Sequence, residues 1–259
     1  MSGLAGRGAV VTGGGRGIGR AVAEALAAAG AAVVVCARSA AELESTADAI
    51  REAGGDAHAI ACDVTDPAAV ERLAEEAGER LGEVDILINN AGASFAQPLR
   101  RLTLDQWNEA LAVNATGPFL CTRAFLPAMV ERGRGRVITV ASVAGITGAP
   151  YIAAYAAAKH AAVGFVRAVA AEVAGSGVTV NALCPGYVDT DMTRRSIDRI
   201  VEKTGRTERE ARAAILERSP QGRLIAPTEV AHAVAFLCSD GAASINGEAL
   251  VMDGGELRR

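Results

Sequence analysis

Two side chains whose types and spacing suit proton transfer lie in the segment YIAAYAAAKHAAVGFVRAVAAEVAG, residues 151–175. This Ala-rich segment predicts one long helix, on which Tyr155 and Lys159 share a face about 6 Å apart along the axis. An ammonium near a phenol favours the phenolate and lowers the pKa of the tyrosine from its reference value of about 10. The pair is therefore a candidate donor and acceptor of a proton at a reacting oxygen.

Two further polar residues precede this pair in the chain. Ser142 follows the apolar run GRVITVA, and Asn114 lies in LAVNATGPF. We expect Ser142 at the carboxyl end of a strand, where ligands bind in open α/β sheets and a hydroxyl can orient a carbonyl oxygen. Pro118 should kink the helix around Asn114 and free backbone carbonyls that hold a water molecule. Tyr151 is a competing proton donor, but it lacks a cation four residues on.

Metal chemistry and histidine catalysis have no comparable support. The three histidines have no H-x-x-x-H spacing, so no metal site is predicted: His58, His160 and His232. The five cysteines form no C-x-x-C pair and stand in apolar surroundings: Cys36, Cys62, Cys121, Cys184 and Cys238. Reduced thiols and a cytoplasmic location are therefore expected.

A glycine-rich loop near the N-terminus is suited to a phosphate group. The run GAVVTGGGRGIGRAVAEALAAAG places Gly13, Gly17 and Gly19 after an apolar strand and before an Ala-rich helix. Glycines there allow a tight turn, let backbone N–H groups approach a pyrophosphate, and leave the helix N-terminus facing its negative charge. The arrangement predicts that a dinucleotide binds there.

The loop TGGGRGIG, residues 12–19, resembles the T-G-x-x-x-G-x-G loop of the short-chain dehydrogenase/reductase family. The overall look of the chain, including ARS after the second strand, resembles the 3-oxoacyl carrier-protein reductases and polyketide ketoreductases of that family. The resemblance continues in family order over nearly the whole chain, through Asp63, the NNAG run 89–92, Asn114, Ser142, Tyr155, Lys159, Pro185 and Gly186. It implies an oxidoreductase that interconverts a ketone and a secondary alcohol with a nicotinamide cofactor, Tyr155 exchanging the proton. It also implies that Lys159 binds the nicotinamide ribose, Asp63 binds the adenine and Asn114 serves a proton relay.

The cofactor preference is predicted from VVVCARS, residues 33–39, which contains the end of the second strand and the residues just after it. Relatives that prefer NAD carry an acidic residue where this chain has Ala37, followed by Arg38. Arg38 and Arg16 can hold a 2′-phosphate by charge-assisted hydrogen bonds of about 1.5–3 kcal/mol each, so NADP(H) is expected and NAD(H) is the alternative. The predicted cofactor-binding residues are Thr12, Gly13, Gly15, Arg16, Gly17, Ile18, Gly19, Arg38, Ser39, Asp63, Val64, Asn90, Ala91, Gly92, Tyr155, Lys159, Pro185, Gly186, Val188 and Thr190.

The elements that must position these residues alternate along the chain. Each short β-branched run precedes a segment of helical spacing, which is the pattern of βαβ units around a parallel sheet. We expect one α/β domain over residues 1–259, a doubly wound Rossmann fold of about seven strands. The strands are expected near 8–12, 32–36, 57–61, 84–88, 135–141, 177–183 and 248–251. Residues 187–227 are charged and helical without a strand, which favours a substrate lid, the alternative being a solvated helix pair.

Charge and composition limit the partners. The net charge of −4 gives no basic field for nucleic acid or an anionic membrane, and no apolar run reaches the roughly 18 residues of a membrane span. A small-molecule substrate is therefore expected. The Tyr155 helix is Ala-rich around much of its circumference, which predicts burial on two sides, and the family resemblance implies a homotetramer.

Small and apolar residues dominate the predicted substrate pocket, which favours a hydrophobic ketone or an acyl thioester over a free sugar. Its residues are Ser94, Ser142, Val143, Ala144, Gly145, Tyr155, Gly186, Tyr187 and Met192. In the lid, Arg194, Arg195 and Arg199 are candidates to meet the phosphate of a carrier protein or of coenzyme A, the alternative being solvated surface.

Three other functions remain open from the sequence. The long lid resembles that of NAD(H)-dependent hydroxyacid or hydroxyacyl-CoA dehydrogenases, and an alicyclic alcohol dehydrogenase belongs to the same alternative. A dinucleotide-sensing regulator would be expected to have lost Tyr155 or Lys159, and both are present. A sugar-nucleotide epimerase normally needs a longer C-terminal substrate region than 259 residues allow.

Overall fold

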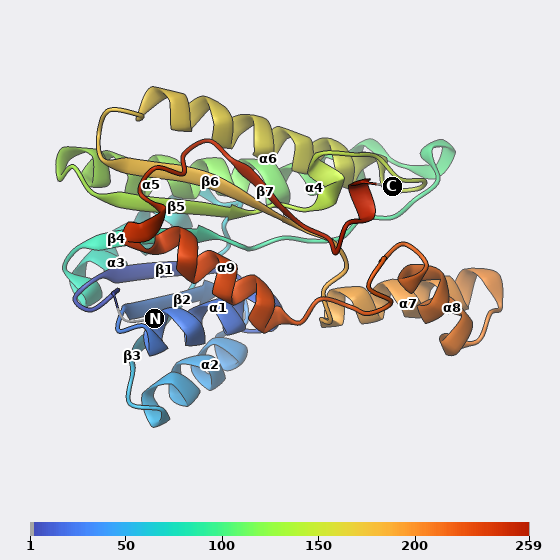
Figure 1. The fold of residues 1–259 in the computed structure, drawn as a ribbon, viewed down its shortest axis with the longest axis horizontal. Coiled ribbons are helices and arrows are strands. Elements are labelled where there is room, and N and C mark those ends of the chain that lie inside the picture. The colour runs from blue at the N-terminus through green and yellow to red at the C-terminus, as the bar shows by residue number, and fades with distance from the viewer. Residues whose placement is uncertain (1–2, 259) are drawn as a thin grey trace.

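A seven-stranded sheet forms the centre of the computed structural model, which describes residues 3–258 (Figure 1). The strand order is β3-β2-β1-β4-β5-β6-β7, and every neighbouring pair is parallel. The strands are β1 Gly8–Thr12, β2 Ala32–Ala37, β3 Asp56–Ala61, β4 Val84–Asn89, β5 Gly135–Val140, β6 Val178–Pro185 and β7 Ala249–Met252. The predicted Rossmann fold of about seven strands is confirmed, and each strand was expected within two residues of its observed bounds.

Helices connect the strands and cover both faces of the sheet (Figure 1). They are α1 Gly17–Ala28, α2 Ala40–Glu52, α3 Pro67–Leu81, α4 Leu104–Leu111, α5 Gly117–Glu131, α6 Ala153–Glu172, α7 Asp191–Thr204, α8 Glu208–Leu216 and α9 Pro227–Cys238. Short 3-10 helices are η1 Leu99–Arg101, η3 Val143–Gly145, η4 Asp240–Ala242 and η5 Glu256–Arg258, and η2 Ala112–Thr116 is a π-helix.

The core lies in two layers, one on each face of the sheet. In β1, Ala9 and Val11 pack into the layer that holds Leu26 of α1, whereas Val10 packs into the layer that holds Phe125 of α5. Strands buried on both faces have continuously apolar sequences, which explains the Ala- and Val-rich runs. This rigid sheet brings the residues that follow its strands to one edge.

The helix around Tyr155 is shorter than predicted. Instead of spanning 151–175, α6 begins at Ala153 and ends at Glu172. Tyr151 lies before the helix in a left-handed backbone conformation with φ of 70°, and Gly177 has φ of 80° in the turn that leads into β6. Tyr151 therefore does not share a helical face with Tyr155, and the idea that it competes as proton donor on that helix was wrong.

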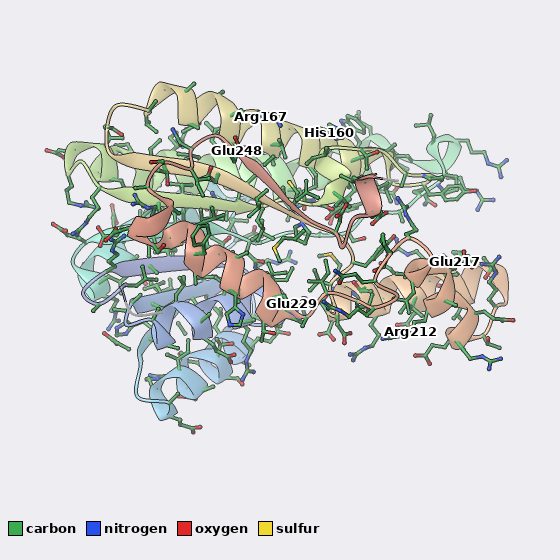
Figure 2. All side chains as sticks on the ribbon, viewed as in Figure 1. His160, Arg167, Arg212, Glu217, Glu229 and Glu248 are labelled. Atoms are coloured by element: carbon green, nitrogen blue, oxygen red, sulfur yellow. The ribbon has the colours of Figure 1, made fainter. Side chains whose placement is uncertain are left out.

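The predicted lid region holds the helices α7 and α8, which project away from the sheet (Figure 1). A small apolar cluster of its own packs these helices together: Ile197, Ala211, Ile215 and Leu224. Figure 2 shows the charged side chains of Arg212 and Glu217 on this projecting part. Strand-like pairing within it is limited, over the described residues, to an isolated bridge between Val188 and Ile225.

Residues 3–258 form neither a helix suited to span a membrane nor a cluster of metal-binding side chains. None of the helices in this range has the combined length and apolar character that a membrane span needs. Side chains of His, Cys, Asp and Glu in the same range form no group of three or more suited to a metal ion.

Candidate active site

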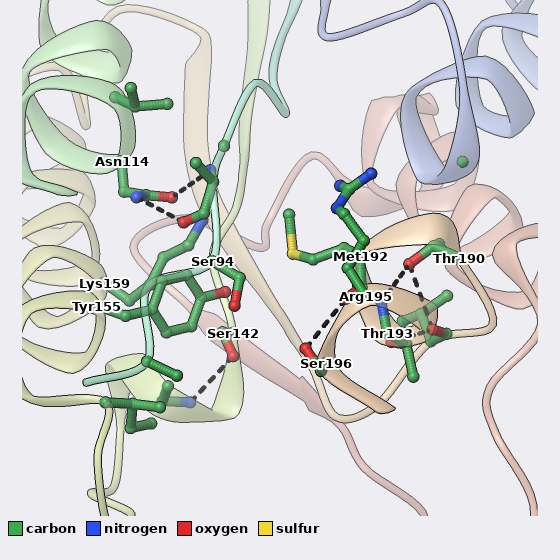
Figure 3. A pocket seen from close by; sticks show the side chains of 18 of the residues that line it. Ser94, Asn114, Ser142, Tyr155, Lys159, Thr190, Met192, Thr193, Arg195 and Ser196 are labelled. Atoms are coloured by element: carbon green, nitrogen blue, oxygen red, sulfur yellow. Dashed lines mark hydrogen bonds between the residues drawn. The ribbon is translucent and has the colours of Figure 1, made fainter. Parts of the chain in front are cut away.

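A cavity of about 1260 Å³ runs along the carboxyl edge of the sheet, from the glycine loop at one end to the lid at the other. It is lined by the loops that follow β1 to β6 and by α7. Figure 3 shows Ser94, Asn114, Ser142, Tyr155 and Lys159 on one side of the cavity, facing the first turns of α7 on the other. The four predicted catalytic residues are thus brought together at one place.

Tyr155 and Lys159 point from the same face of α6 into the cavity, as their spacing predicted (Figure 3). The Nζ atom of Lys159 lies 5.8 Å from the centroid of the Tyr155 ring. It donates a hydrogen bond of 3.0 Å to the carbonyl oxygen of Val140, the last residue of β5. Only 5% of Lys159 is exposed, so this carbonyl anchors a buried ammonium at the strand end.

The pKa of Tyr155 does not shift in the predicted direction. Burial raises its pKa to about 12, against the smaller opposing effect of the neighbouring Ser142. Burial also lowers the pKa of Lys159 to about 8. The expected lowering of the tyrosine pKa by Lys159 was therefore wrong for the protein alone, because removal from water disfavours both charged forms. At neutral pH the phenol is protonated, which is the form that donates a proton.

Ser142 lies two residues after the end of β5 and caps the N-terminus of the short helix η3. Its hydroxyl oxygen accepts a hydrogen bond of 3.1 Å from the backbone N–H of Ala144. This contact fixes the hydroxyl at the carboxyl end of the strand, beside Tyr155 (Figure 3). Ser142 can still donate its own proton to a carbonyl oxygen that sits next to the phenol.

Asn114 lies in a π-helix rather than in a helix kinked by proline. The five residues of η2 separate α4 from α5, and Pro118 stands in the first turn of α5, where proline is well tolerated. The side-chain amide of Asn114 donates to the carbonyls of Ala110 and Ala93, each at 3.0 Å, and its oxygen accepts from the N–H of Ala93 at 3.3 Å. The side chain thus holds the loop after β4, and the proton relay stays a prediction.

The glycine loop fits a dinucleotide pyrophosphate. Gly13 and Gly17 have φ of 65° and 54°, and a Cβ atom at Gly19 would lie 2.1 Å from the carbonyl oxygen of Gly13. At the start of α1, Arg16 makes no capping hydrogen bond through its side chain, and the first turn holds no acidic residue. The N–H groups of this turn are therefore free to bind an anion in the cavity.

Three predicted cofactor-binding residues brace the loop. The hydroxyl of Thr12 accepts from the N–H groups of Asn90 and Ala91, each at 3.0 Å, and the Asn90 amide donates to the carbonyls of Thr12 and Gly13 at 2.9 and 3.2 Å. Thr12 and Gly19 do not line the cavity, whereas the other predicted cofactor-binding residues do. Thr12 and Gly19 therefore support the cavity-lining residues of the loop without lining the cavity themselves.

At the adenosine end, Arg16 and Arg38 both line the cavity and are exposed. Arg16 forms a 3.0 Å ion pair with Glu42, a residue that the sequence analysis did not single out. The carboxylate of Asp63 accepts hydrogen bonds from the N–H and hydroxyl of Thr65, and these bonds hold its pKa below the usual value. Asp63 is thus an ionised acceptor at the cavity wall.

The predicted substrate residues line the cavity with one exception. Gly145 is buried in η3, and a Cβ atom there would lie 2.8 Å from the backbone oxygen of Lys159. Gly145 therefore permits close packing of η3 on α6, and its placement in the pocket lining was wrong. Tyr187, by contrast, lines the cavity, and burial raises the pKa of its phenol.

Two contacts of the site connect segments far apart in the chain, and no local sequence pattern marked them. One is the bond between Lys159 and the Val140 carbonyl. The other is a 2.8 Å ion pair between Arg218, which follows α8, and Glu256 near the C-terminus. Both Arg218 and Glu256 line the cavity, so the C-terminal segment is tied to the lid.

The comparisons with known proteins agree with this geometry. Residues 7–200 match the family described as short chain dehydrogenase. The chain belongs to the short-chain dehydrogenase family. The predicted membership, and with it the prediction that the chain is an oxidoreductase of this family, is confirmed.

Relatives within the short-chain dehydrogenase family are similar over nearly the whole chain. The 3-oxoacyl-acyl-carrier-protein reductase FabG of Escherichia coli is 44% identical over 248 residues, which are 95% of this chain and 96% of the relative. Among solved structures, a tryptophan-substituted actinorhodin polyketide ketoreductase with NADPH is 39% identical, with a TM-score of 0.94 and 99% of each chain covered. Levodione reductase is 35% identical, with a TM-score of 0.93 and coverage of 97% and 98%.

Proposed function

We propose that this short-chain dehydrogenase reduces the ketone of a 3-oxoacyl thioester, or of a similar hydrophobic substrate, to a secondary alcohol with NADPH. The observation that carries the proposal is the protonated phenol of Tyr155, set beside Ser142 and Lys159 where the dinucleotide end of the cavity meets its apolar end. The names of the FabG relative and of the NADPH-bound polyketide ketoreductase support it.

When bound, NADPH supplies the hydride that reduces the carbonyl carbon. The Tyr155 hydroxyl donates its proton to the substrate oxygen as negative charge develops there, and Ser142 orients that oxygen by a second hydrogen bond. Lys159, held by the Val140 carbonyl, places a cation close to the phenol. This cation stabilises the negative charge of the phenolate that remains after the proton has been transferred. Asn114 fixes the loop that carries Ala93 and, with it, one wall of the pocket.

The preference for NADPH rests on the two exposed arginines at the adenosine end. Arg16 and Arg38 offer a bidentate site for a 2′-phosphate, and Ala37 leaves no carboxylate at the end of β2 to accept from a ribose hydroxyl. Glu42 acts against this preference through its ion pair with Arg16.

A second candidate is an NAD(H)-dependent dehydrogenase of a hydroxyacid, a hydroxyacyl-CoA or an alicyclic alcohol. Two observations favour it: the two-helix lid formed by α7 and α8, and the Glu42 carboxylate beside Arg16. A dinucleotide-sensing regulator has less support, because the proton-transfer residues and the apolar pocket are both in place.

Initial rates with a panel of substrates test the proposal. The purified protein is supplied with NADPH or NADH and with acetoacetyl thioesters, cyclic ketones and 2-oxo acids, and cofactor absorbance is followed. We expect the highest kcat/KM for an acetoacetyl thioester with NADPH. A higher kcat/KM for a hydroxyacid with NAD⁺ would favour the second candidate, and absence of turnover with every pair would reject both.

We also propose that residues 1–259 work as one domain with the lid at about 187–227, and that the chain forms a homotetramer. Phe119 of α5 is 40% exposed and packs edge-to-face on Phe165 of α6 with centroids 6.0 Å apart, which gives these helices an apolar outer surface for a second copy. Light scattering tests the assembly, and a monomeric mass would contradict it.

The proposed location is the cytoplasm. The five free, buried thiols suit its reducing conditions.

A further inference from the structure

The outer end of the substrate cavity carries a concentration of positive charge. Beyond Tyr155 the cavity lies between η1 and α7, and it is lined there by four exposed guanidinium groups, which we call the arginine clamp: Arg100, Arg101, Arg195 and Arg199. Two come from each segment. Figure 3 shows Arg195 next to Met192, on the side of the cavity opposite Tyr155.

A hydrogen bond ties the two halves of the clamp to each other. Arg199 of α7 donates through Nη1 to the carbonyl oxygen of Ala96 at 3.3 Å, and Ala96 stands three residues before η1. The guanidinium group of Arg199 therefore reaches across the cavity to the segment that leads into Arg100 and Arg101.

The clamp arginines lack carboxylate partners, whereas their neighbours have them. Over the described residues, no salt bridge joins any of the four to an acidic side chain. Arg194, next to Arg195 in the chain, pairs with Asp191 at 3.6 Å and does not line the cavity, and Arg218 pairs with Glu256 at 2.8 Å. The structure thus separates Arg194 from Arg195 and Arg199, with which the sequence grouped it.

Acidic residues do not neutralise this charge. Of the acidic residues that line the cavity, Glu42 and Asp63 belong to its adenosine end, and Asp191 and Glu256 pair with other arginines, which leaves Glu109 of α4. Among the residues that line the cavity, one carboxylate thus stands against these four guanidinium groups, which gives this part of the lining a positive excess on a chain whose net charge is −4. Such a local excess attracts a multiply charged anion, and planar guanidinium groups match the oxygens of a phosphate in pairs.

We propose that the arginine clamp is a binding subsite for the phosphate ester of the substrate's pantetheine arm. The inference rests on the proposed function, since it assumes that the carbonyl of a thioester reaches Tyr155. The apolar acyl part then fills the inner pocket, and the polar arm leaves between η1 and α7 past the clamp. The subsite differs from that of the cofactor's 2′-phosphate, which lies at the opposite end of the cavity with Arg16 and Arg38.

Three acetoacetyl thioesters with NADPH test the proposal. The N-acetylcysteamine thioester has no phosphate, the coenzyme A thioester has a pantetheine phosphate and nucleotide phosphates, and the carrier-protein thioester has the pantetheine phosphate and an acidic protein. The variants are R195E/R199E and R100E/R101E. The matched control is R206E/R209E, which reverses two exposed charges of the same lid that do not line the cavity.

In both clamp variants we expect kcat/KM to fall about tenfold or more at low salt for the coenzyme A thioester and for the carrier-protein thioester, mainly through KM. The N-acetylcysteamine thioester should stay within about twofold of wild type, which also reports correct folding, and the control variant should resemble wild type with all three. The loss should shrink at high salt, because screening lengths fall from about 10 Å at 0.1 M to about 3 Å at 1 M. R195K/R199K should recover most of the lost kcat/KM.

Each contrary result has a separate meaning. Equal losses with all three thioesters, or no loss, would overturn the subsite. A loss confined to one of the two pantetheine thioesters would also overturn it, since the arginines would then meet acidic side chains of the carrier protein, or the nucleotide phosphates of coenzyme A, instead of the pantetheine phosphate. If the wild type reduced the thioesters while both clamp variants matched it with all three, the subsite alone would be wrong. If the wild type turned over no thioester, the proposed function would fail, and the subsite with it.

Discussion

Three charges at the adenosine end set the expected choice between NADPH and NADH. Arg38 is exposed, and Arg16 is held at 3.0 Å by Glu42. A charge-assisted hydrogen bond contributes about 1.5–3 kcal/mol, and the lower value suits an exposed group. Because about 1.4 kcal/mol corresponds to a factor of ten, R38A should lower kcat/KM for NADPH about tenfold. The value for NADH should stay within about twofold, since that cofactor has no phosphate for Arg38 to bind.

Glu42 provides the opposite perturbation at the same place. Two like charges 4 Å apart repel by about 1 kcal/mol in water, so E42Q should raise kcat/KM for NADPH about fivefold without affecting NADH. Initial rates with both cofactors at one thioester concentration measure both effects. The control is R51A, an exposed arginine of α2 that pairs with Glu44 and Asp48 and does not line the cavity. Equal changes for both cofactors in R38A, or a lower KM for NADH than for NADPH in the wild type, would refute the reasoning.

Three further substitutions test the catalytic helix and the turn that precedes it. Y155F should lower kcat by about 10²–10⁴, because it removes the proton donor, while circular dichroism and thermal melting stay unchanged; retained turnover in the folded variant would exclude the mechanism. In the wild type, burial lowers the pKa of Lys159 to about 8 from 10.5, so between these values the unfolded chain binds more protons and stability rises with pH. Urea unfolding of wild type and K159M at pH values of about 7.5 and 9.5 should show this rise in the wild type relative to the variant; parallel curves would contradict it. Y151G should raise the free energy of unfolding by about 0.5–1 kcal/mol, because relief of about 1–2 kcal/mol of strain at φ of 70° exceeds the added freedom of glycine in the unfolded chain. A loss of stability in Y151G would mean that the exposed tyrosine makes a stabilising contact.

The sequence was sufficient for features that depend on spacing along one element. Buried parallel strands have continuous apolar runs, so all seven were located, and the four-residue spacing put Tyr155 and Lys159 on one face of α6. The glycine loop was equally clear, since tight turns and close packing at Gly13 and Gly19 demand glycine. These features depend on residues that are close together in the chain, so they can be predicted from a single sequence.

Features that depend on packing between distant segments could not be predicted in this way. The raised pKa of Tyr155 arises from burial under several elements, which the spacing to Lys159 does not report. Gly145 looked like pocket lining from its nearness to Ser142, but it faces the backbone of α6. The ion pair of Arg16 with Glu42 joins the glycine loop to α2, and the helix α1 and the strand β2 separate the two residues in the chain. Sequence periodicity shows on which face of a helix or strand a residue lies, but it does not show which distant segments pack against that face.

The distribution of charge along the cavity explains how one site can orient a long substrate and a dinucleotide together. Guanidinium groups lie at both ends, Arg16 and Arg38 beyond the glycine loop and Arg195 and Arg199 on the lid, while the phenol between them is neutral. With the proposed thioester and NADPH, the anionic groups at the far ends of the two ligands would be attracted to opposite ends of the cavity, which would leave their uncharged reacting parts to meet at Tyr155. Thr190, which caps the start of α7, lies next to Gly17: a Cβ atom added to Gly17 would be 3.3 Å from the Thr190 methyl group. The start of the lid therefore packs against the glycine loop. Binding energy from the charged ends can therefore serve to position the carbonyl, which the pocket residues around Ser142 and Met192 contact mainly through small or apolar groups.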